Sequence, residues 1–100
     1  MQDITVEELK QKLDNKEELL LIDVREDWEY QDFNIGAKLI PLGTLQGAVD
    51  DLDAWQNKEV VVLCKSGGRS AAAKDFMVKQ GFAKVRNLLG GMVEWQAKFS

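Results

Sequence analysis

The single cysteine of the sequence, Cys64, stands where an apolar run ends and a glycine-containing loop begins. The run before it is Val-Val-Val-Leu, and the residues after it are Lys65, Ser66, Gly67, Gly68, Arg69 and Ser70. If this loop leads into a helix, its backbone N–H groups and the positive end of the helix stabilise a thiolate. Lys65 and Arg69 add positive charge, and such surroundings lower a cysteine pKa from about 8.5 to roughly 3.5–7.5. The segment predicts a reactive Cys64 with a substrate-binding cradle formed by the six residues that follow it.

A competing interpretation is structural, because a free cysteine at a strand end is most often a small core residue. The two adjacent glycines favour the reactive interpretation, since they permit close approach of a ligand and give nothing to a structural thiol. We expect Arg69 to bind an anion or to brace the loop rather than to pair with a surface carboxylate. For Lys65, a binding role and a merely solvated one are equally open.

The absence of histidine from the sequence excludes several mechanisms. Ser/His/Asp and Cys/His nucleophile pairs, HExxH zinc sites and histidine-relayed acid–base chemistry all need an imidazole. One cysteine also cannot form an intrachain disulfide or a multi-cysteine metal site, and the acidic residues have no metal-binding spacing. We therefore expect neither a metal nor a bound cofactor.

Length and charge restrict the class of protein. One hundred residues, 45% of them hydrophobic, fit one domain spanning residues 1–100. The net charge of −4 and the lack of a basic run argue against nucleic-acid and anionic-membrane partners. No apolar run approaches the ~20 residues of a membrane span, and the start at Met1 does not look like a secretory signal. We expect a cytoplasmic protein, unless a leader has been removed.

Apolar patterning predicts strands alternating with helices. The expected strands are 19–24, 38–40, 59–64 and 85–88. The expected helices are one ending near Asn15 after a Thr5/Glu8 capping box, a turn at 28–33, one capped by Thr44, one over 70–80 ended by Gly81, and one after Gly91. This order predicts an α/β domain with a central parallel sheet flanked by helices on both faces, and ligand sites at the carboxyl ends of its strands.

Two strand ends therefore stand out, the one at Cys64 and the one at Asp23-Val24-Arg25. Polar groups that end a buried strand must be paired, so we expect Asp23 and Arg25 to have partners. The tryptophans Trp28, Trp55 and Trp95 are expected to be buried or partly buried packing residues.

Several short segments together carry a family resemblance. They are Leu21-Ile22-Asp23-Val24-Arg25 with Trp28-Glu29-Tyr30, Ile35-Gly36-Ala37, Ile40-Pro41-Leu42, the loop from Cys64 to Ser70, Gly81-Phe82, and Asn87-Leu88-Leu89-Gly90-Gly91 with Trp95. In this order and spacing, the chain resembles a single-domain rhodanese, a sulfurtransferase that carries sulfur on its cysteine. The resemblance implies a parallel sheet of about five strands, Cys64 as the sulfur carrier, and the loop backbone with Arg69 as the binding cradle. It also implies that Asp23 and Arg25 brace the site rather than react.

Two departures from related sequences are visible. Most family members have a histidine before the Gly-Ala pair, where this chain has Asn34 and is one residue shorter, which affects local shape near the site. Related phosphatases have a histidine before the cysteine and five residues between cysteine and arginine, whereas here Leu63 precedes Cys64 and only four residues separate it from Arg69. A phosphatase or arsenate reductase is therefore the weaker alternative.

The resemblance implies a reaction in which the Cys64 thiolate takes a sulfane sulfur from thiosulfate or a related donor. The resulting persulfide serves as a covalent intermediate without any cofactor, and a thiol, or cyanide in an assay, removes the sulfur. The main alternative is a persulfide relay or sensor module that exchanges sulfur with a partner protein. An inactive structural domain is disfavoured because Cys64 is present.

Overall fold

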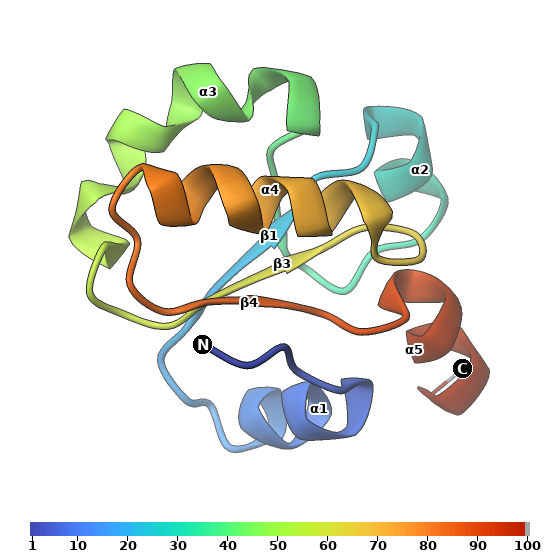
Figure 1. Cartoon of the computed structure of the whole chain (residues 1–100). Coiled ribbons are helices and arrows are strands. Elements are labelled where there is room, and N and C mark those ends of the chain that lie inside the picture. Colours follow the sequence, from blue (N-terminus) through green and yellow to red (C-terminus); the bar gives the residue numbers. More distant parts are fainter. Residues whose placement is uncertain (100) are drawn as a thin grey trace.

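Four parallel strands form the centre of the computed structural model, which describes residues 1–99. Their order across the sheet is β2-β1-β3-β4, and helices cover both faces (Figure 1). The strands are β1 (Leu20–Asp23), β2 (Lys38–Leu39), β3 (Val60–Leu63) and β4 (Val85–Asn87). The helices are α1 (Val6–Asp14), α2 (Asp27–Asp32), α3 (Leu45–Ala48), α4 (Gly68–Lys79) and α5 (Gly91–Phe99), with 3-10 turns η1 (Leu42–Thr44) and η2 (Val49–Trp55). The predicted α/β class with a helix-flanked parallel sheet is confirmed.

The expectation of about five strands is wrong for the described residues, which form four. At the place of a fifth strand, beside β4, only an isolated parallel bridge joins Ile4 to Leu88. The Ile4 N–H donates to the Asn87 carbonyl, and the Leu89 N–H donates to the Ile4 carbonyl. A longer ladder cannot form, because Thr5 caps α1 through its bond to the Glu8 N–H and turns the chain into the helix.

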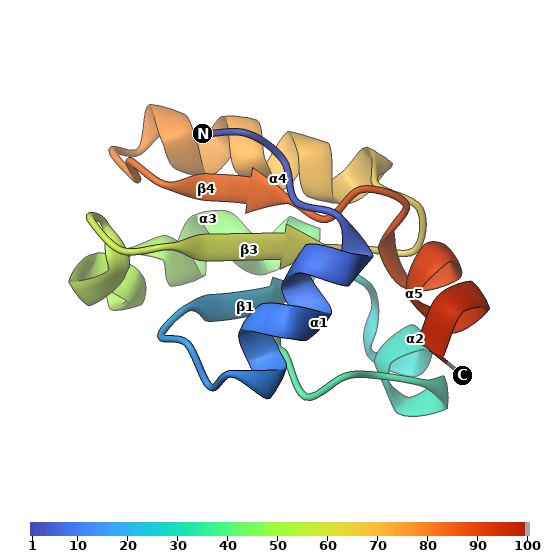
Figure 2. The same cartoon turned by 90° about the horizontal axis from the view of Figure 1, so that it is seen from below.

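The central strand β3 separates two apolar cores. Val60, Val62 and Cys64 belong to the core under α3 and α4, whereas Val61 and Leu63 belong to the core under α1 and α5. Figure 2 shows α1 on one side of the strands and α3 and α4 on the other. Every residue of β3 is fully buried, and each such side chain contributes roughly 1.5–3 kcal/mol of burial free energy. The strand that leads into Cys64 is therefore buried on both of its faces.

The helix after the cysteine begins two residues before its predicted start at residue 70, at Gly68. Gly67 is its N-terminal capping residue, and its φ of 116° lies in the left-handed region that favours glycine. Gly81 follows the helix with a φ of 100°, as predicted. The early start places Gly68, Arg69 and Ser70 in the first turn of α4, so the loop after Cys64 is very short.

The three tryptophans differ in how far their side chains are exposed to solvent. Trp95 is buried and Trp55 is partly buried, as expected, but the prediction for Trp28 is wrong because 73% of its surface is exposed. Trp28 lies on α2, a six-residue helix whose buried residue is Glu29. Among residues 1–99, no helix combines the length and the apolar character that a membrane span requires.

Candidate active site

Cys64 follows β3 directly and is 1% exposed. Its carbonyl oxygen accepts the Met92 N–H at 2.9 Å, and the carbonyl oxygen of Lys65 accepts the Val93 N–H at 2.9 Å. These donors come from the first turn of α5, where backbone N–H groups have no partner inside the helix. Gly91 permits this close approach, because a Cβ there would lie 2.7 Å from the Lys65 oxygen and would also touch the Cys64 oxygen. The cysteine backbone is thus fixed by β3 on one side and by α5 on the other.

Three donors point at the Cys64 sulfur. They are the Gly67 N–H at 3.1 Å, the Ser70 N–H at 3.4 Å and the Ser70 hydroxyl at 3.3 Å. Burial of the sulfur raises the Cys64 pKa, whereas hydrogen bonds from Ser70, Gly67 and Ser66 lower it, and the net result is a pKa below the ordinary cysteine value. The principal donors to the Cys64 sulfur are therefore uncharged hydrogen-bonding groups of Gly67 and Ser70.

Ser70 also belongs to a second set of hydrogen bonds that involves Asn87, the last residue of β4. The Ser70 hydroxyl lies 2.5 Å from Asn87 Oδ1, and Asn87 Nδ2 donates to the Gly67 carbonyl at 3.2 Å. Asn87 is buried, and β4 pairs with β3 so that Asn87 stands beside Val62. Sequence reasoning missed this residue. The available signal was a polar side chain at the carboxyl end of a strand adjacent to the cysteine strand.

Arg69 forms a two-point ion pair with Glu29 of α2, with distances of 2.6 and 2.9 Å. Glu29 is 9% exposed, and the hydrogen bond from Arg69 lowers its pKa from 4.5 to about 2 against the opposing effect of burial. Arg69 therefore does pair with a carboxylate, although this carboxylate is largely buried rather than on the open surface. The pair ties the first turn of α4 to α2, which is an architectural role for Arg69. Glu29 itself was not identified as a site residue from the sequence.

Asp23 and Arg25 pair with each other at the end of β1, as expected. The Arg25 guanidinium contacts both carboxylate oxygens at 2.8–3.1 Å, and its Nη2 also donates to the Phe33 carbonyl at 2.6 Å. Both side chains are buried. Because Asp23 stands beside Leu63 in the sheet register, this pair closes the carboxyl end of β1 next to the cysteine loop and fixes the segment that enters α2.

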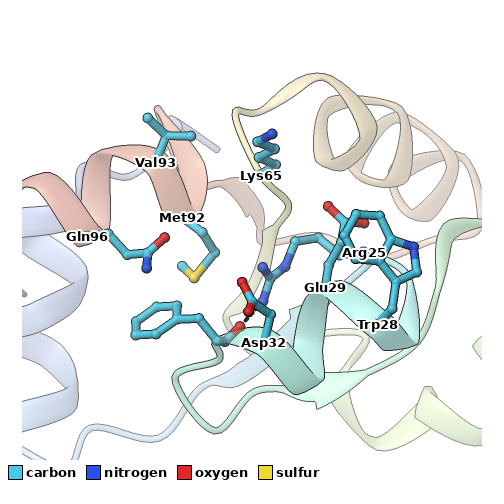
Figure 3. A pocket seen from close by; sticks show the side chains of 9 residues that line it. Arg25, Trp28, Glu29, Asp32, Lys65, Met92, Val93 and Gln96 are labelled. Atoms are coloured by element: carbon cyan, nitrogen blue, oxygen red, sulfur yellow. Dashed lines mark hydrogen bonds between the residues drawn. The ribbon is translucent and has the colours of Figure 1, made fainter.

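A pocket of about 140 Å³ opens beside the cysteine loop. Figure 3 shows Lys65 on the loop, Arg25 with the α2 side chains on one side, and the α5 side chains on the other. Its lining consists of Arg25, Trp28, Glu29, Asp32, Phe33, Lys65, Met92, Val93 and Gln96. The exposed Lys65, the residue that follows Cys64, therefore lines this pocket.

The remaining predicted residues occupy defined places. Ser66 and Gly68 are exposed, and the Ser66 N–H helps to lower the Cys64 pKa while Gly68 opens α4. Asn34, which stands where related sequences have histidine, accepts the Gly36 N–H through Oδ1 and donates to the Tyr30 carbonyl. Asn34 therefore closes the turn after α2 by local hydrogen bonds.

Comparison with known proteins places this geometry in a family. Residues 5–98 match the model of the rhodanese-like domain. The chain is 42% identical over 97 residues to the putative sulfur carrier protein YrkF of Bacillus subtilis, covering 96% of this chain but 51% of that protein. It is 37% identical to the putative sulfurtransferase YtwF of the same organism, covering 98% and 93% of the two chains. The structure of the human single-domain sulfurtransferase TSTD1 superposes with a TM-score of 0.85 at 25% identity, covering 98% and 97% of the two chains.

Proposed function

Because this chain belongs to the rhodanese-like domain family, we propose that it moves a sulfane sulfur from thiosulfate or a related donor to a thiophilic acceptor through a persulfide on Cys64. Its sulfurtransferase and sulfur-carrier relatives support sulfur transfer in general. The observation that carries the specific proposal is the convergence of the Gly67 and Ser70 donors on a buried sulfur with a lowered pKa. A thiolate stabilised in this way attacks without a general base, which suits a sequence without histidine.

In the first step, the Cys64 thiolate attacks the outer sulfur of thiosulfate. A bond forms between Sγ and that sulfur, the bond between the two thiosulfate sulfurs breaks, and its electron pair leaves with sulfite. The negative charge then resides on the terminal sulfur of the persulfide. Lys65 at the mouth of the site supplies positive charge toward the arriving sulfonate group, whereas Arg69 holds the loop through Glu29.

In the second step, a thiolate acceptor attacks the terminal sulfur of the persulfide. The bond between Sγ and that sulfur breaks, and Cys64 leaves as a thiolate, ready for another cycle. Cyanide can take the sulfur in the same manner and leaves as thiocyanate. The sequence has no second cysteine to release the sulfur, so the acceptor is an external nucleophile. The cycle needs no cofactor beyond the covalent persulfide, and a reducing compartment such as the cytoplasm suits its single thiol.

A protein-to-protein persulfide relay is the second candidate. The observation that favours it is Trp28, which is 73% exposed and lines the pocket beside the cysteine loop. Exposed aromatic side chains are enriched at protein interfaces. The relative YrkF, whose name describes a sulfur carrier and of which this chain spans about half, fits such a relay. In this case the donor or acceptor would be a cysteine of another protein, and thiosulfate turnover would be incidental.

Intact-mass spectrometry of the purified protein before and after thiosulfate tests the main proposal. We expect the mass of one added sulfur that a reductant removes, and we expect Cys64→Ser to fold normally, acquire no sulfur and catalyse no transfer, because its hydroxyl is not ionised at neutral pH. Added sulfur on the Cys64→Ser protein would place the chemistry elsewhere. Loading by a protein persulfide but not by thiosulfate would favour the relay.

A further inference from the structure

Asn87 lies outside the cysteine loop, yet its side chain contacts Gly67 and Ser70, whose hydrogen bonds reach the cysteine sulfur at 3.1–3.4 Å. Asn87 Nδ2 donates to the Gly67 carbonyl at 3.2 Å, and its Oδ1 accepts the Ser70 hydroxyl at 2.5 Å. The first contact sets the orientation of the carboxamide, because a carbonyl oxygen can pair only with the NH₂ group. The carboxamide oxygen is therefore directed at Ser70. The backbone of Asn87 is held by bonds to Asp3 and Ile4, so this direction is fixed.

The Ser70 hydroxyl has one proton and three acceptors within reach. They are Cys64 Sγ at 3.3 Å, the Gly67 carbonyl at 3.2 Å and Asn87 Oδ1 at 2.5 Å. The Gly67 carbonyl already accepts the Ala71 N–H and Asn87 Nδ2, which fills its two lone pairs. Ser70 is fully buried, so bulk water does not take part. The competition for the proton is therefore between the sulfur and the carboxamide oxygen.

We propose that Asn87 is a positioning residue whose carboxamide oxygen holds the Ser70 hydroxyl proton whenever the cysteine sulfur is uncharged and releases it to the sulfur whenever a thiolate is present. The catalytic part of this proposal rests on the proposed function. In the free enzyme, Sγ is negative and attracts the proton. In the persulfide, Sγ is a neutral bridging atom and the charge lies on the terminal sulfur, so the proton returns to Asn87. The proton rotates with its own hydroxyl and is not transferred.

As a consequence, the Cys64 thiolate is stabilised less than it would be without Asn87. Each time Cys64 ionises, Ser70 gives up its bond to Asn87, and this cost keeps the thiolate from being stabilised by the full strength of the hydroxyl. A thiolate of lower pKa is a weaker nucleophile but a better leaving group. The first step of the cycle uses Cys64 as the nucleophile, and the second uses it as the leaving group. Asn87 thus balances the two steps.

The charged groups that surround this cluster are the same in the parent and in every uncharged variant at Asn87 or Ser70. On the sulfur side, Arg69 is bound to Glu29, and Asp23 is bound to Arg25. On the Asn87 side, Asp3 accepts the Asn87 N–H and pairs with Lys74. Lys65 stands at the pocket mouth.

The experiment measures the Cys64 pKa from the pH dependence of alkylation by iodoacetamide in the parent, Asn87→Leu, Asn87→Asp, Ser70→Ala and the double variant Asn87→Leu with Ser70→Ala. Asn87→Leu removes the competing acceptor, so we expect the pKa to fall by roughly half a unit. Asn87→Asp supplies a stronger, negative acceptor, so we expect the pKa to rise by at least as much. In the Ser70→Ala background, Asn87→Leu should leave the pKa unchanged.

A lowered pKa in Asn87→Leu that is lost when Ser70 is alanine would establish the role, whereas the rise in Asn87→Asp also contains the direct repulsion between its carboxylate and the thiolate. A pKa that does not fall in Asn87→Leu, or a fall that persists when Ser70 is alanine, overturns the proposal, because a merely structural role does not act through the Ser70 hydroxyl. If leucine prevents folding at this buried position, Asn87→Ala removes the same acceptor and must give the same sign. The alkylation readout needs no sulfur donor, so failure of thiosulfate turnover would count against the proposed function and leave this inference intact.

Discussion

Replacing Glu29 by glutamine tests whether the ion pair with Arg69 fixes the cysteine loop to α2. The substitution keeps the shape of the side chain and one acceptor oxygen but removes the charge. Glu29 is 9% exposed and receives two short bonds from Arg69, whose side chain is 35% exposed. Its Oε1 also accepts the Glu26 N–H, which caps the start of α2. Loss of its charge therefore weakens the contact between α2 and the first turn of α4.

The size of the effect follows from the pKa of Glu29, which Arg69 lowers from 4.5 to about 2. A shift of this size corresponds to at most ~3.4 kcal/mol of folding free energy. Water screens the partly exposed Arg69, so we expect Glu29→Gln to lower the free energy of unfolding at pH 7 by about 1–2 kcal/mol. Because the folded pKa lies below the unfolded one, this stability is complete above about pH 4.5 and is lost as the pH falls toward 2. The parent and the variant should therefore converge in acid, with less than half of the difference left at about pH 3.

Urea unfolding followed by tryptophan fluorescence at pH 7, 5 and 3 measures both quantities. The matched control is Glu18→Gln, which removes a carboxylate from the exposed pair with Lys58 at 3.5 Å and should change the free energy of unfolding by less than about 0.5 kcal/mol at each pH. Equal stability of Glu29→Gln and the parent at pH 7 would refute the reasoning. A difference that stays constant down to pH 3 would show that the charge of Glu29 is not its cause.

Two further predictions concern the mouth and the backbone of the site. Lys65→Ala should raise the apparent KM for thiosulfate severalfold and leave the transfer of sulfur from the persulfide to the acceptor unchanged. The control Lys79→Ala, at the far end of α4, should change neither quantity. An unchanged KM in Lys65→Ala would mean that this lysine is merely solvated. Gly91 has a φ of 55°, and a Cβ there would meet the Cys64 and Lys65 carbonyl oxygens. Gly91→Ala should therefore lower the free energy of unfolding by more than about 2 kcal/mol. Its control, Gly47→Ala, meets open space inside α3 and should raise the free energy of unfolding by about 0.4–1 kcal/mol. Thermal unfolding of both glycine variants checks this contrast, and similar stabilities would show that α5 does not depend on the close approach.

The strands and the position of Cys64 at a strand end, before a loop of donors, were predictable from the sequence because they depend on local signals. The run of Val60 to Leu63 is apolar at every position, which is typical of a strand buried on both faces, and it is buried throughout. The glycine-containing segment after Cys64 predicted a donor cradle, and Gly67 does take a left-handed conformation there. Signals of this kind act over a few residues, so the sequence displays them directly.

The partners of the site come from distant parts of the chain, and no local pattern predicts them. Glu29 is 40 residues from Arg69, and Asn87 is 17 residues from Ser70. Their roles follow from the packing of α2 and β4 against the loop. The strand number was wrong for a similar reason, because the length of the pairing beside β4 depends on where Thr5 begins α1. The exposure of Trp28 likewise depends on how α2 is placed, since a short helix can bury either of its faces.

The electrostatic character of the site favours sulfur over phosphate as the transferred group. Lys65 and Arg69 were expected to add positive charge near the sulfur, but Arg69 is neutralised by Glu29 and Lys65 stands at the rim. The groups that contact the sulfur are backbone N–H groups and one hydroxyl. Such neutral donors suit a single negative charge on one sulfur atom, whereas a phosphoryl group spreads charge over three oxygens and needs a cation directed at them. Removing Glu29 would release Arg69 toward the cysteine, so the Glu29→Gln variant offers a second measurement: if the ion pair keeps the site neutral, the Cys64 pKa of that variant should fall below the pKa of the parent.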